Sequence, residues 1–532
     1  MFETGTASNY LDLLDRLDIF LTAGGSAFGL TYVGTGNGTI SGLKGGASSV
    51  AETFTLTATS ASSFNVVGSV SGSIGPATVG TPFSHAKLGF LITAGGTAFT
   101  AGDAFTLSTA PKWTNLRRSM GSTVLATQGN AGINAAQNLV DGKDESSLQY
   151  WRVDTPVTLP QDVQFTLHEA ATVASYELAG FYLLAAYGPK SWTFDYWNGS
   201  AWVTLDTQSN ISSWTELGVM TFPIGSPVSA TLYRLHITAI NFASALVLGA
   251  ARLLRSTGVD VAFGQFIWQA PGNDGDSQIF VGARPFERID ADYFDWELAG
   301  FDGFNASAKW RRQAGWQGHL YLPLWNSSIP YWFIADGRRA IIIAKIDAQY
   351  EMAYLGFADP YFSPGQWPYP LILGGTLAFD EAYPAWNSTT FRWSNSTNNH
   401  RMPTHSDIRG QGSPTAGYAH LRARNLNGIW LPLVATQNDF YTTTPTSTEH
   451  IIWPYRCGLT LLDANRDGSY GLWPVILNLS APNTLGQLRG VACVTGQGLT
   501  SETLIRLGSI DWLALPNINR TDREDYLAAA LD

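Results

Sequence analysis

The sequence predicts an all-β, multidomain protein with one small helix near its N-terminus. The chain has 532 residues, which is more than a single hydrophobic core usually serves. Apolar and polar residues alternate in many short stretches, as in residues 53–57 and 104–108, and this period is typical of strands with one buried face. Hydrophobic residues make up 45% of the chain and include 19 Trp, 21 Tyr and 27 Phe, so several cores can be filled.

Residues 9–21 predict the one amphipathic helix. Ser8 and Asn9 precede it as candidate N-caps. The apolar residues recur at three- and four-residue spacing and are Tyr10, Leu13, Leu14, Leu17 and Leu21. We expect this apolar stripe to pack on the helix's own domain or on a partner subunit.

The first predicted domain, residues 1–112, joins this helix to a β-sandwich used in assembly. The phrase at residues 52–59 returns at 103–110, and the phrase at 21–28 returns at 92–99, which indicates a duplicated β unit. The glycine-rich run at 34–42 lacks the Lys-Ser/Thr of a phosphate loop and predicts hairpin turns instead. Gly102 to Leu107 is similar to a phrase in the β-sandwich linker domains of phage tail and baseplate proteins.

The second predicted domain, residues 113–256, is richer in Trp. Alternation in residues 191–197 places Trp192, Phe194 and Tyr196 on one strand face and Trp197 on the other. Asn198-Gly199 then predicts a two-residue hairpin turn. The phrases at 138–143, 150–151, 164–167, 172–176, 188–194, 202–205 and 233–235, in this order, resemble the F5/8 type C, or discoidin-like, jelly roll.

This resemblance implies binding of sugars, lipid headgroups or protein surfaces through loops at one end of the domain. Trp197 and Tyr187 are the candidate carbohydrate-binding residues. The alternative for Trp197 is packing across its hairpin or under a neighbouring domain. Asp141 would be the acid of the family's calcium loop, but residues 249–254 carry no carboxylate, and calcium needs several anionic oxygens. We therefore predict no metal and no other cofactor.

The third predicted domain, residues 257–532, is a β-rich module for attachment to a virion. Residues 340–346 predict a buried strand, and the polar stretch 387–414 predicts a long loop. The phrases at 321–325, 329–333, 336–339, 354–357 and 519–526 are similar to a C-terminal module of tail-associated virion proteins of phages. This similarity does not by itself indicate the fold of the module.

Nothing in the sequence marks a catalytic centre, so we predict that the protein is not an enzyme. It contains no G-x-S-x-G nucleophile motif. The acids Asp290, Asp292, Asp295 and Glu297 cluster, and we interpret them as a solvated strand edge. Because two carboxylates from distant segments suffice for glycan cleavage, a polysaccharide depolymerase stays open as an alternative.

Charge and hydropathy restrict the partners. The net charge is -11 and the lysines and arginines form no run, which argues against nucleic acid. Residues 1–17 lack the features of a signal peptide, and no apolar run reaches membrane-spanning length, so we expect no membrane insertion. Only 14% of residues are charged, and surfaces poor in charge suit large interfaces.

Together with the resemblances, this predicts a structural protein of a tailed-bacteriophage tail or baseplate. It would be made in the host cytoplasm and located in the virion. Its partners would be copies of itself in a symmetric oligomer, other tail or baseplate proteins and, through the jelly roll, host-surface polysaccharide. The alternative is an adhesin whose main role is to bind that polysaccharide.

Overall fold

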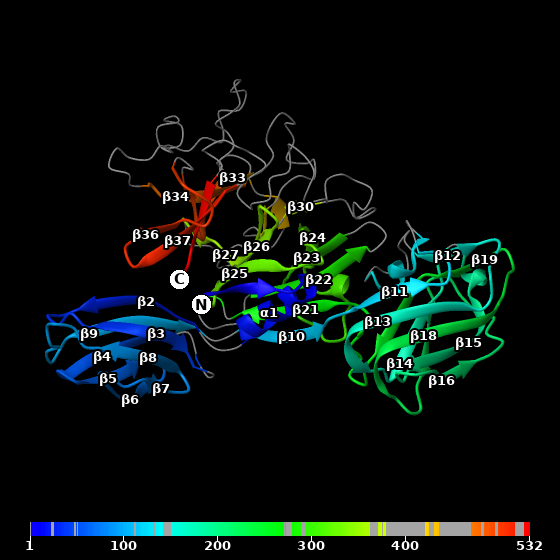
Figure 1. The fold of residues 1–532 in the computed structure, drawn as a ribbon, viewed down its shortest axis with the longest axis horizontal. Helices are drawn as coiled ribbons and strands as arrows, with labels where there is room; N and C mark the ends of the chain where they lie inside the picture. Colours follow the sequence, from blue (N-terminus) through cyan, green and yellow to red (C-terminus); the bar gives the residue numbers. More distant parts are fainter. Residues whose placement is uncertain are drawn as a thin grey trace, which may run out of the picture.

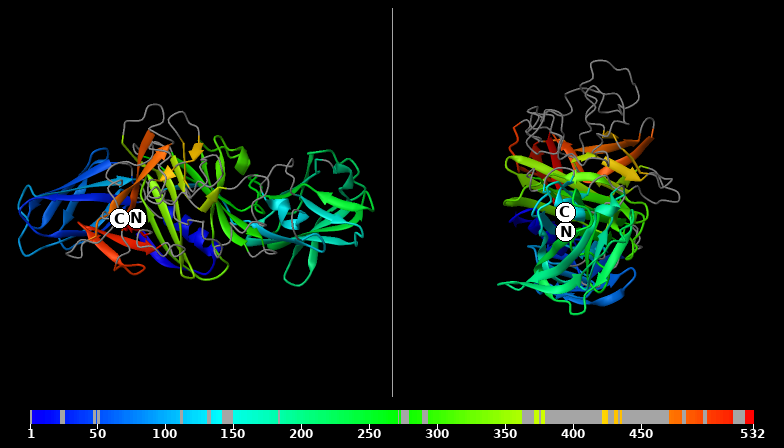
Figure 2. Two further views of the ribbon diagram at one scale, coloured as in Figure 1. Left: turned by 90° about the horizontal axis from the view of Figure 1, so that it is seen from above. Right: turned by 90° about the vertical axis from the view of Figure 1, so that its right-hand side faces the viewer.

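The protein consists of a central body with one smaller unit on each side (Figure 1). The computed structural model describes residues 2–22, 26–46, 49, 52–110, 113–130, 134–141, 150–182, 184–270, 272, 279–288, 293–361, 371–374, 376–378, 421–424, 430–432, 434–435, 470–479, 483–494, 498–516 and 526–532. A β-sandwich (residues 26–110) and a jelly roll (residues 121–262) lie at opposite ends of the long axis, also when viewed from above (Figure 2). The predicted all-β, multidomain class is confirmed.

The central body contains three antiparallel sheets. The first has the order β10 (Thr114–Ser119), β21 (Gln265–Ala270), β22 (Ile279–Arg288), β23 (Tyr293–Phe301), β24 (Gln317–Leu322) and β30 (Thr376–Ala378). The second has the order β1 (Phe2–Ala7), β25 (Ile329–Ala335), β26 (Arg339–Ile346), β27 (Gln349–Phe357), β29 (Leu371–Gly374), β31 (Leu421–Arg424) and β32 (Trp430–Pro432). The third has the order β33 (Val434–Ala435), β34 (Trp473–Leu479), β35 (Asn483–Val494), β38 (Tyr526–Ala530), β37 (Ile510–Pro516) and β36 (Leu504–Leu507), with β28 (Asp359–Pro360) beside β35.

Strand β26 is buried on both faces, as its apolar run predicts. Ile342 packs in the core between the first and second sheets, whereas Ile341 and Ile343 pack in the core between the second and third. All three side chains are fully buried. The stretch 387–414 and the acids Asp290 and Asp292 lie outside the described residues.

Helix α1 (Tyr10–Thr22) forms where the sequence predicts it. The side chain of Asn9 caps it by accepting from the backbone N–H groups of Leu11 and Asp12, each at 2.9 Å. The predicted stripe is buried, and Phe20 joins it. The stripe packs in the core between the first and second sheets, and the indole of Trp296 donates to the carbonyl oxygen of Tyr10 at 2.9 Å.

The grouping of the chain therefore differs from the predicted boundaries. Strand β1 pairs with β25, and β10 pairs with β21. The helix and residues 114–119 thus belong to the central body rather than to the sandwich and the jelly roll. The physical reason is that the apolar stripe of the helix finds its matching apolar surface on β22, β23 and β25, far along the chain.

The β-sandwich contains two sheets around one core. One sheet has the order β2 (Ser26–Val33), β9 (Ala104–Ala110), β4 (Glu52–Ser60), β5 (Ser63–Gly68) and β6 (Gly72–Thr78), and the other has the order β3 (Thr39–Gly45), β8 (Leu88–Thr93) and β7 (Phe83–Ser84). The repeated phrases 52–59 and 103–110 form the neighbouring strands β4 and β9.

A buried carboxylate organises the glycine-rich run of this sandwich. Asp103 accepts from the backbone N–H groups of Thr100, Thr35 and Gly36, each at 3.0 Å. These hydrogen bonds hold the pKa of Asp103 well below its usual range. Residues 34–38 connect β2 to β3, which lie in different sheets, and residues 39–42 begin β3. The predicted hairpin turns are therefore wrong, because Asp103 fixes a connection that crosses from one sheet to the other.

The jelly roll packs a five-stranded sheet against two smaller sheets. The large sheet has the order β11 (Ser122–Ala126), β13 (Gln161–Thr172), β18 (Ser229–Ile240), β15 (Pro189–Trp197) and β16 (Trp202–Gln208). The smaller sheets have the order β17 (Val219–Pro223), β14 (Ser175–Ala179) and β20 (Ala250–Leu254), and the pair β12 (Trp151–Asp154) and β19 (Ala245–Leu248). Short 3-10 turns are η2 (Ala136–Val140) and η3 (Ala185–Tyr187).

The alternation predicted for β15 is confirmed, but the turn after it is not. Trp192 and Phe194 are buried in the core. Four residues, 198–201, connect β15 to β16, and only Gly199 of the Asn-Gly pair has a positive φ, +99°. The predicted two-residue turn is wrong because the side chain of Asn198 accepts from the backbone N–H groups of Ser200 and Ala201 and so stabilises a wider loop.

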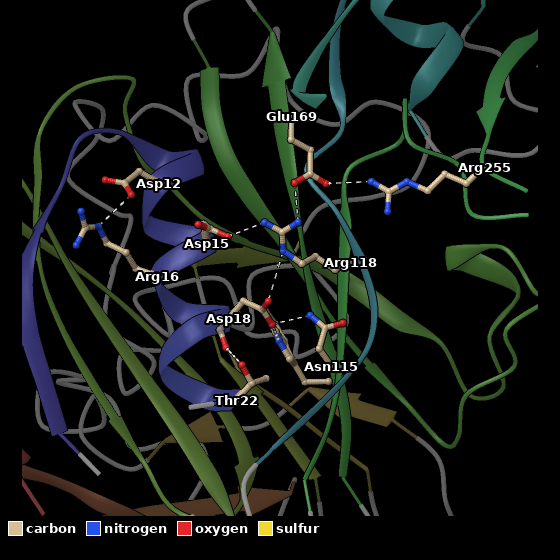
Figure 3. A network of polar contacts seen from close by, with 10 residues as sticks. Asp12, Asp15, Arg16, Asp18, Thr22, Asn115, Arg118, Glu169 and Arg255 are labelled. Carbon is tan, nitrogen blue, oxygen red and sulfur yellow. Dashed lines mark hydrogen bonds and ion pairs between the residues drawn. The ribbon is translucent and has the colours of Figure 1, made fainter. Parts of the chain in front are cut away.

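An ionic network joins the jelly roll to the central body (Figure 3). Arg118, on β10, contacts Asp15 of the helix at 2.7 Å and Glu169 of β13 at 2.6 Å. Arg255 contacts the other oxygen of Glu169 at 3.4 Å. Burial lowers the pKa of Arg118, but the hydrogen bonds to Asp15 and Glu169 outweigh it and raise the pKa. Because one guanidinium joins three elements, it helps to fix how the jelly roll sits on the body.

Among the described residues, none of the helices has the length and apolar character needed to span a membrane.

Candidate functional site

The strand order of the jelly roll separates a free end from an attached end. Pro189 at the start of β15 is opposite Ile240 at the end of β18, and Gln161 at the start of β13 is opposite Ile237. The connections 155–160, 180–188 and 241–244 therefore gather at one end, which we call the loop end. The chain enters at Ser122 and leaves after Leu254 away from this end, since Leu254 pairs with Ser175, which follows the far end of β13.

The loop end carries five aromatic side chains, which we call the loop-end cluster: Tyr150, Phe181, Tyr182, Tyr187 and Phe242. The rings of Tyr150 and Phe181 are stacked with centroids 3.8 Å apart, and those of Tyr187 and Phe242 lie 5.2 Å apart. Phe181 is buried, whereas Tyr182 is 46% and Phe242 is 49% exposed. The cluster thus has a packed base and two aromatic rings open to solvent.

Hydrogen bonds hold the loops of this cluster in place. The side-chain amide of Asn241, next to Phe242, donates to the carbonyl oxygens of Gly188 at 2.9 Å and Ile211 at 3.1 Å. The indole of Trp214 donates to the carbonyl oxygen of Pro189 at 2.8 Å. A Cβ atom at Gly188 would lie 2.5 Å from the Trp214 ring, so this position requires glycine. The connection that carries Phe242 is therefore tied to the end of the connection that carries Tyr182.

The three connections 155–160, 180–188 and 241–244 are uncharged. They contain no Asp, Glu, Lys, Arg or His. The neighbouring Arg152 donates to Asp154 at 2.6 Å, and hydrogen bonds to Tyr150 and Asp154 raise its pKa. On these three connections a ligand would meet aromatic faces, tyrosine hydroxyls and backbone groups.

The two predicted carbohydrate-binding residues lie far apart. Tyr187 belongs to the loop-end cluster, whereas Trp197 lies at the other end of β15, roughly 30 Å away along an extended strand. The Trp197 ring meets Trp202 edge to face with centroids 5.5 Å apart and is 37% exposed. The guanidinium of Arg234 covers the Trp202 ring at 4.3 Å. Packing across the hairpin, the alternative considered for Trp197, is what the structure shows.

Four members of the loop-end cluster were not predicted from the sequence. Tyr150 precedes β12, Phe181 and Tyr182 follow β14, and Phe242 follows β18, so these residues are distant in the sequence. The signal available was the presence of aromatic residues in uncharged connections between strands, as in residues 241–244 (Asn-Phe-Ala-Ser).

Asp141, the metal candidate, lies where the jelly roll meets the central body. It lines a cavity of about 40 Å³ together with His168 and Glu287. Within the described part of the chain, no group of three or more His, Cys, Asp or Glu side chains is arranged to hold a metal ion.

The acids Asp295 and Glu297 are buried in the first sheet rather than solvated. Their exposed fractions are 1% and 0%. Glu297 accepts from the guanidinium of Arg284 at 2.5 Å, and Arg284 is itself buried. The interpretation as a solvated edge is wrong for these two residues because both lie inside the body, where Arg284 and Arg311 form ion pairs with Glu297. A substrate cannot reach them.

Comparison with known proteins gives matches to solved structures alone. No protein-family model matches the chain, and no curated protein matches it. The similar structures include chitosan-binding module 1 of a chitosanase/glucanase from Paenibacillus sp. IK-5, at 21% identity and a TM-score of 0.21, covering 25% of this chain and 92% of that chain. Another is the family 32 carbohydrate-binding module of Clostridium perfringens NanJ in complex with galactose, at 16% identity and a TM-score of 0.22, covering 26% and 96%. These neighbours match about a quarter of the chain.

Proposed function

We propose that this protein binds glycans through the loop end of its jelly roll and does not cleave them. The observation that carries the proposal is the pair of half-exposed rings, Tyr182 and Phe242, mounted on loops that are tied together by Asn241. An aromatic face attracts the C–H face of a sugar ring, and a fixed aromatic side chain loses little conformational entropy on binding. Such rings left open on a soluble surface are typical of a binding site.

The ligand class we propose is a neutral sugar. The three connections of the loop end carry no charged side chain, and Arg152 is already engaged by Asp154. An acidic sugar would lose its hydration without gaining an ion pair, which costs free energy. A neutral hexose can instead use the tyrosine hydroxyls and the stacking surface.

The part of the proposal that excludes cleavage is supported by the burial of the clustered acids. Glycan hydrolysis needs two carboxylates that both reach the sugar. The clustered acids Asp295 and Glu297 are sealed inside the central body, and the connections of the loop end contain none.

The test is a binding measurement on the full chain with purified host lipopolysaccharide and a panel of neutral and acidic polysaccharides. We expect Phe242→Ala and Tyr187→Ala to weaken binding to neutral glycans. Trp197→Ala, at the other end of the jelly roll, is the matched control and should bind normally. Equal loss in all three variants, or none, would contradict the proposal, and an increase in reducing ends would show cleavage.

We further propose that the protein is a structural component of a tailed-phage tail or baseplate, located in the virion. This second proposal is supported by the sequence phrases similar to virion modules and by the low charge content of 14%. Mass spectrometry of purified, mature particles tests it. The protein should be present in a fixed ratio to the other tail proteins, and its absence from particles would refute the proposal.

A further inference from the structure

The outward face of the five-stranded sheet in the β-sandwich has no ionisable side chain. In β4, Thr53, Thr55 and Thr57 point away from the core, and the buried Phe54 and Leu56 alternate with them. Their cross-strand neighbours on both sides are also uncharged. We call this surface the threonine face; it consists of Thr31, Val33, Thr53, Thr55, Thr57, Asn65, Val67, Pro76, Ala104, Thr106 and Ser108.

The face also exposes apolar surface. Val33 is 77% exposed and Val67 is 44% exposed. Exposed protein surfaces usually carry interspersed charged side chains, which oppose association. Short, uncharged side chains lose little rotamer entropy when they are covered, and they require little desolvation. The face therefore shares with the core of an interface the lack of charged side chains.

The charges of this unit are kept away from the face. Residues 26–110 contain four residues that are charged at neutral pH, Lys44, Lys87, Glu52 and Asp103, so the unit is neutral in a chain of net charge -11. Lys44 lies in β3 and Lys87 lies beside β8, both in the opposite sheet. Glu52 is turned toward the loop after β5, where it accepts from the backbone N–H of Ser71 at 2.8 Å. Asp103 is held by the turns at Thr35 and Thr100.

The size of the face matches what a specific pair needs. Five strands of six to nine residues, at the usual strand spacing and rise, give a surface of about 24 Å by 24 Å, or roughly 600 Å² per copy. Two such faces bury about 1,200 Å² in total, which is the lower limit of the standard interface size.

We propose that two copies of this protein associate through their threonine faces, as two sheets stacked face to face. This inference rests on the assembly role proposed for the chain and names the surface that performs it. A second copy fits better than a charged partner, because an uncharged face offers nothing to recognise charge. The rest of the chain carries the whole net charge, so this face is where two copies meet with little electrostatic repulsion.

The position of the face leaves the glycan site free. The sandwich lies at the opposite end of the molecule from the jelly roll (Figures 1 and 2). A pair joined through its sandwiches would therefore carry two jelly rolls pointing away from the contact. Two sites on one particle gain avidity for a repetitive polysaccharide.

The experiment measures the self-association of the full chain by sedimentation. Thr55 lies in the central strand β4, opposite Val67 and Thr106, so a face-to-face contact buries it. We expect Thr55→Lys to weaken association at least about 100-fold, because two lysines would be brought together without partners. Thr231→Lys, an exposed strand threonine of the jelly roll, is the matched control and should associate like the parent chain.

A mixture of oppositely charged variants distinguishes loss of the contact from misfolding of the Thr55→Lys chain. Mixing the Thr55→Lys chain with a Thr55→Glu chain should restore association, which a folding defect would not allow. If the parent chain associates and Thr55→Lys leaves this unchanged, the proposed face is wrong while the assembly role stands. If the parent chain is monomeric up to its solubility limit, both fail, and glycan binding is unaffected by either result.

Discussion

Helix α1 offers a test of how the chain is divided into units. Leu17 is 1% exposed and packs between the first and second sheets of the central body, whereas Ile19 is 57% exposed on the same helix. Truncating a fully buried leucine to alanine costs about 3 kcal/mol, because the lost transfer free energy is added to the energy of the cavity left behind. Ile19→Ala removes an exposed side chain and should change stability by less than about 0.5 kcal/mol.

The destabilisation caused by Leu17→Ala should also be confined to the central body. Hydrogen exchange of the full chain, followed by mass spectrometry, reports each unit separately, which matters because a multidomain chain does not unfold in one step. In Leu17→Ala, peptides from β23 and β25 should exchange faster, while peptides from β4 and β15 should be unchanged. If β4 of the sandwich lost protection while β23 and β25 kept theirs, the helix would belong to the sandwich and our grouping of the chain would be wrong.

Three further predictions follow from local contacts. Gly188→Ala should displace Trp214, since the new Cβ would lie 2.5 Å from the Trp214 ring. In a glycan titration this variant should no longer bind, whereas the melting temperature of its central body should equal that of the parent chain. The pKa of Asp103 is lowered in the folded state, so the stabilising effect of this carboxylate is present above about pH 4 and is lost at lower pH. Asp103→Asn should therefore lower the melting temperature of the sandwich at pH 7, and acidification should lower it further by less than in the parent chain. Equal responses to acid in the two chains would refute this. Replacing residues 122–262 with a short Gly-Ser linker should leave a chain that folds and self-associates but no longer binds glycan. Sedimentation and glycan titration check these two properties. A chain that aggregates or does not fold would contradict the division into units.

Elements whose periodicity is set by their own residues could be predicted from the sequence. Leu13, Leu14 and Leu17 recur at helical spacing, and a helix forms there. The run 340–346 is apolar at nearly every position, and β26 is buried on both faces. In both cases the burial of a short segment against any apolar partner is enough to decide its conformation.

The partners of these elements could not be predicted in the same way. Nothing local in residues 10–22 indicates that their apolar surface matches β23, which begins at Tyr293. The acids at 295 and 297 look solvated in isolation, and only the pairing of β22 with β23 shows that Arg284 neutralises Glu297. Long-range pairing fixes these environments, and local patterning does not contain it.

The residues of the candidate site likewise could be predicted only in part, because long-range strand pairing brings them together. The resemblance pointed to a loop end and to Tyr187, but it paired Tyr187 with Trp197, which lies at the opposite end of the same strand. Phe242 lies in a connection with no periodicity, and its place beside Tyr187 depends on the register of β15 with β18. A jelly roll brings loops together by strand order, so its binding residues appear only when the order is known.

The two outer units are insertions into one continuous body. The chain leaves the body after helix α1 and returns at Trp113, whose backbone N–H donates to the carbonyl oxygen of Leu21 at 3.2 Å. It leaves again after Ser119 and returns at Gln265, its neighbour in the pairing of β10 with β21. Each unit is thus joined to the body where its two chain ends lie side by side. The threonine face and the loop end belong to different insertions on opposite sides of the body (Figure 1), so the proposed association and the proposed glycan binding could each change without disturbing the core that connects them.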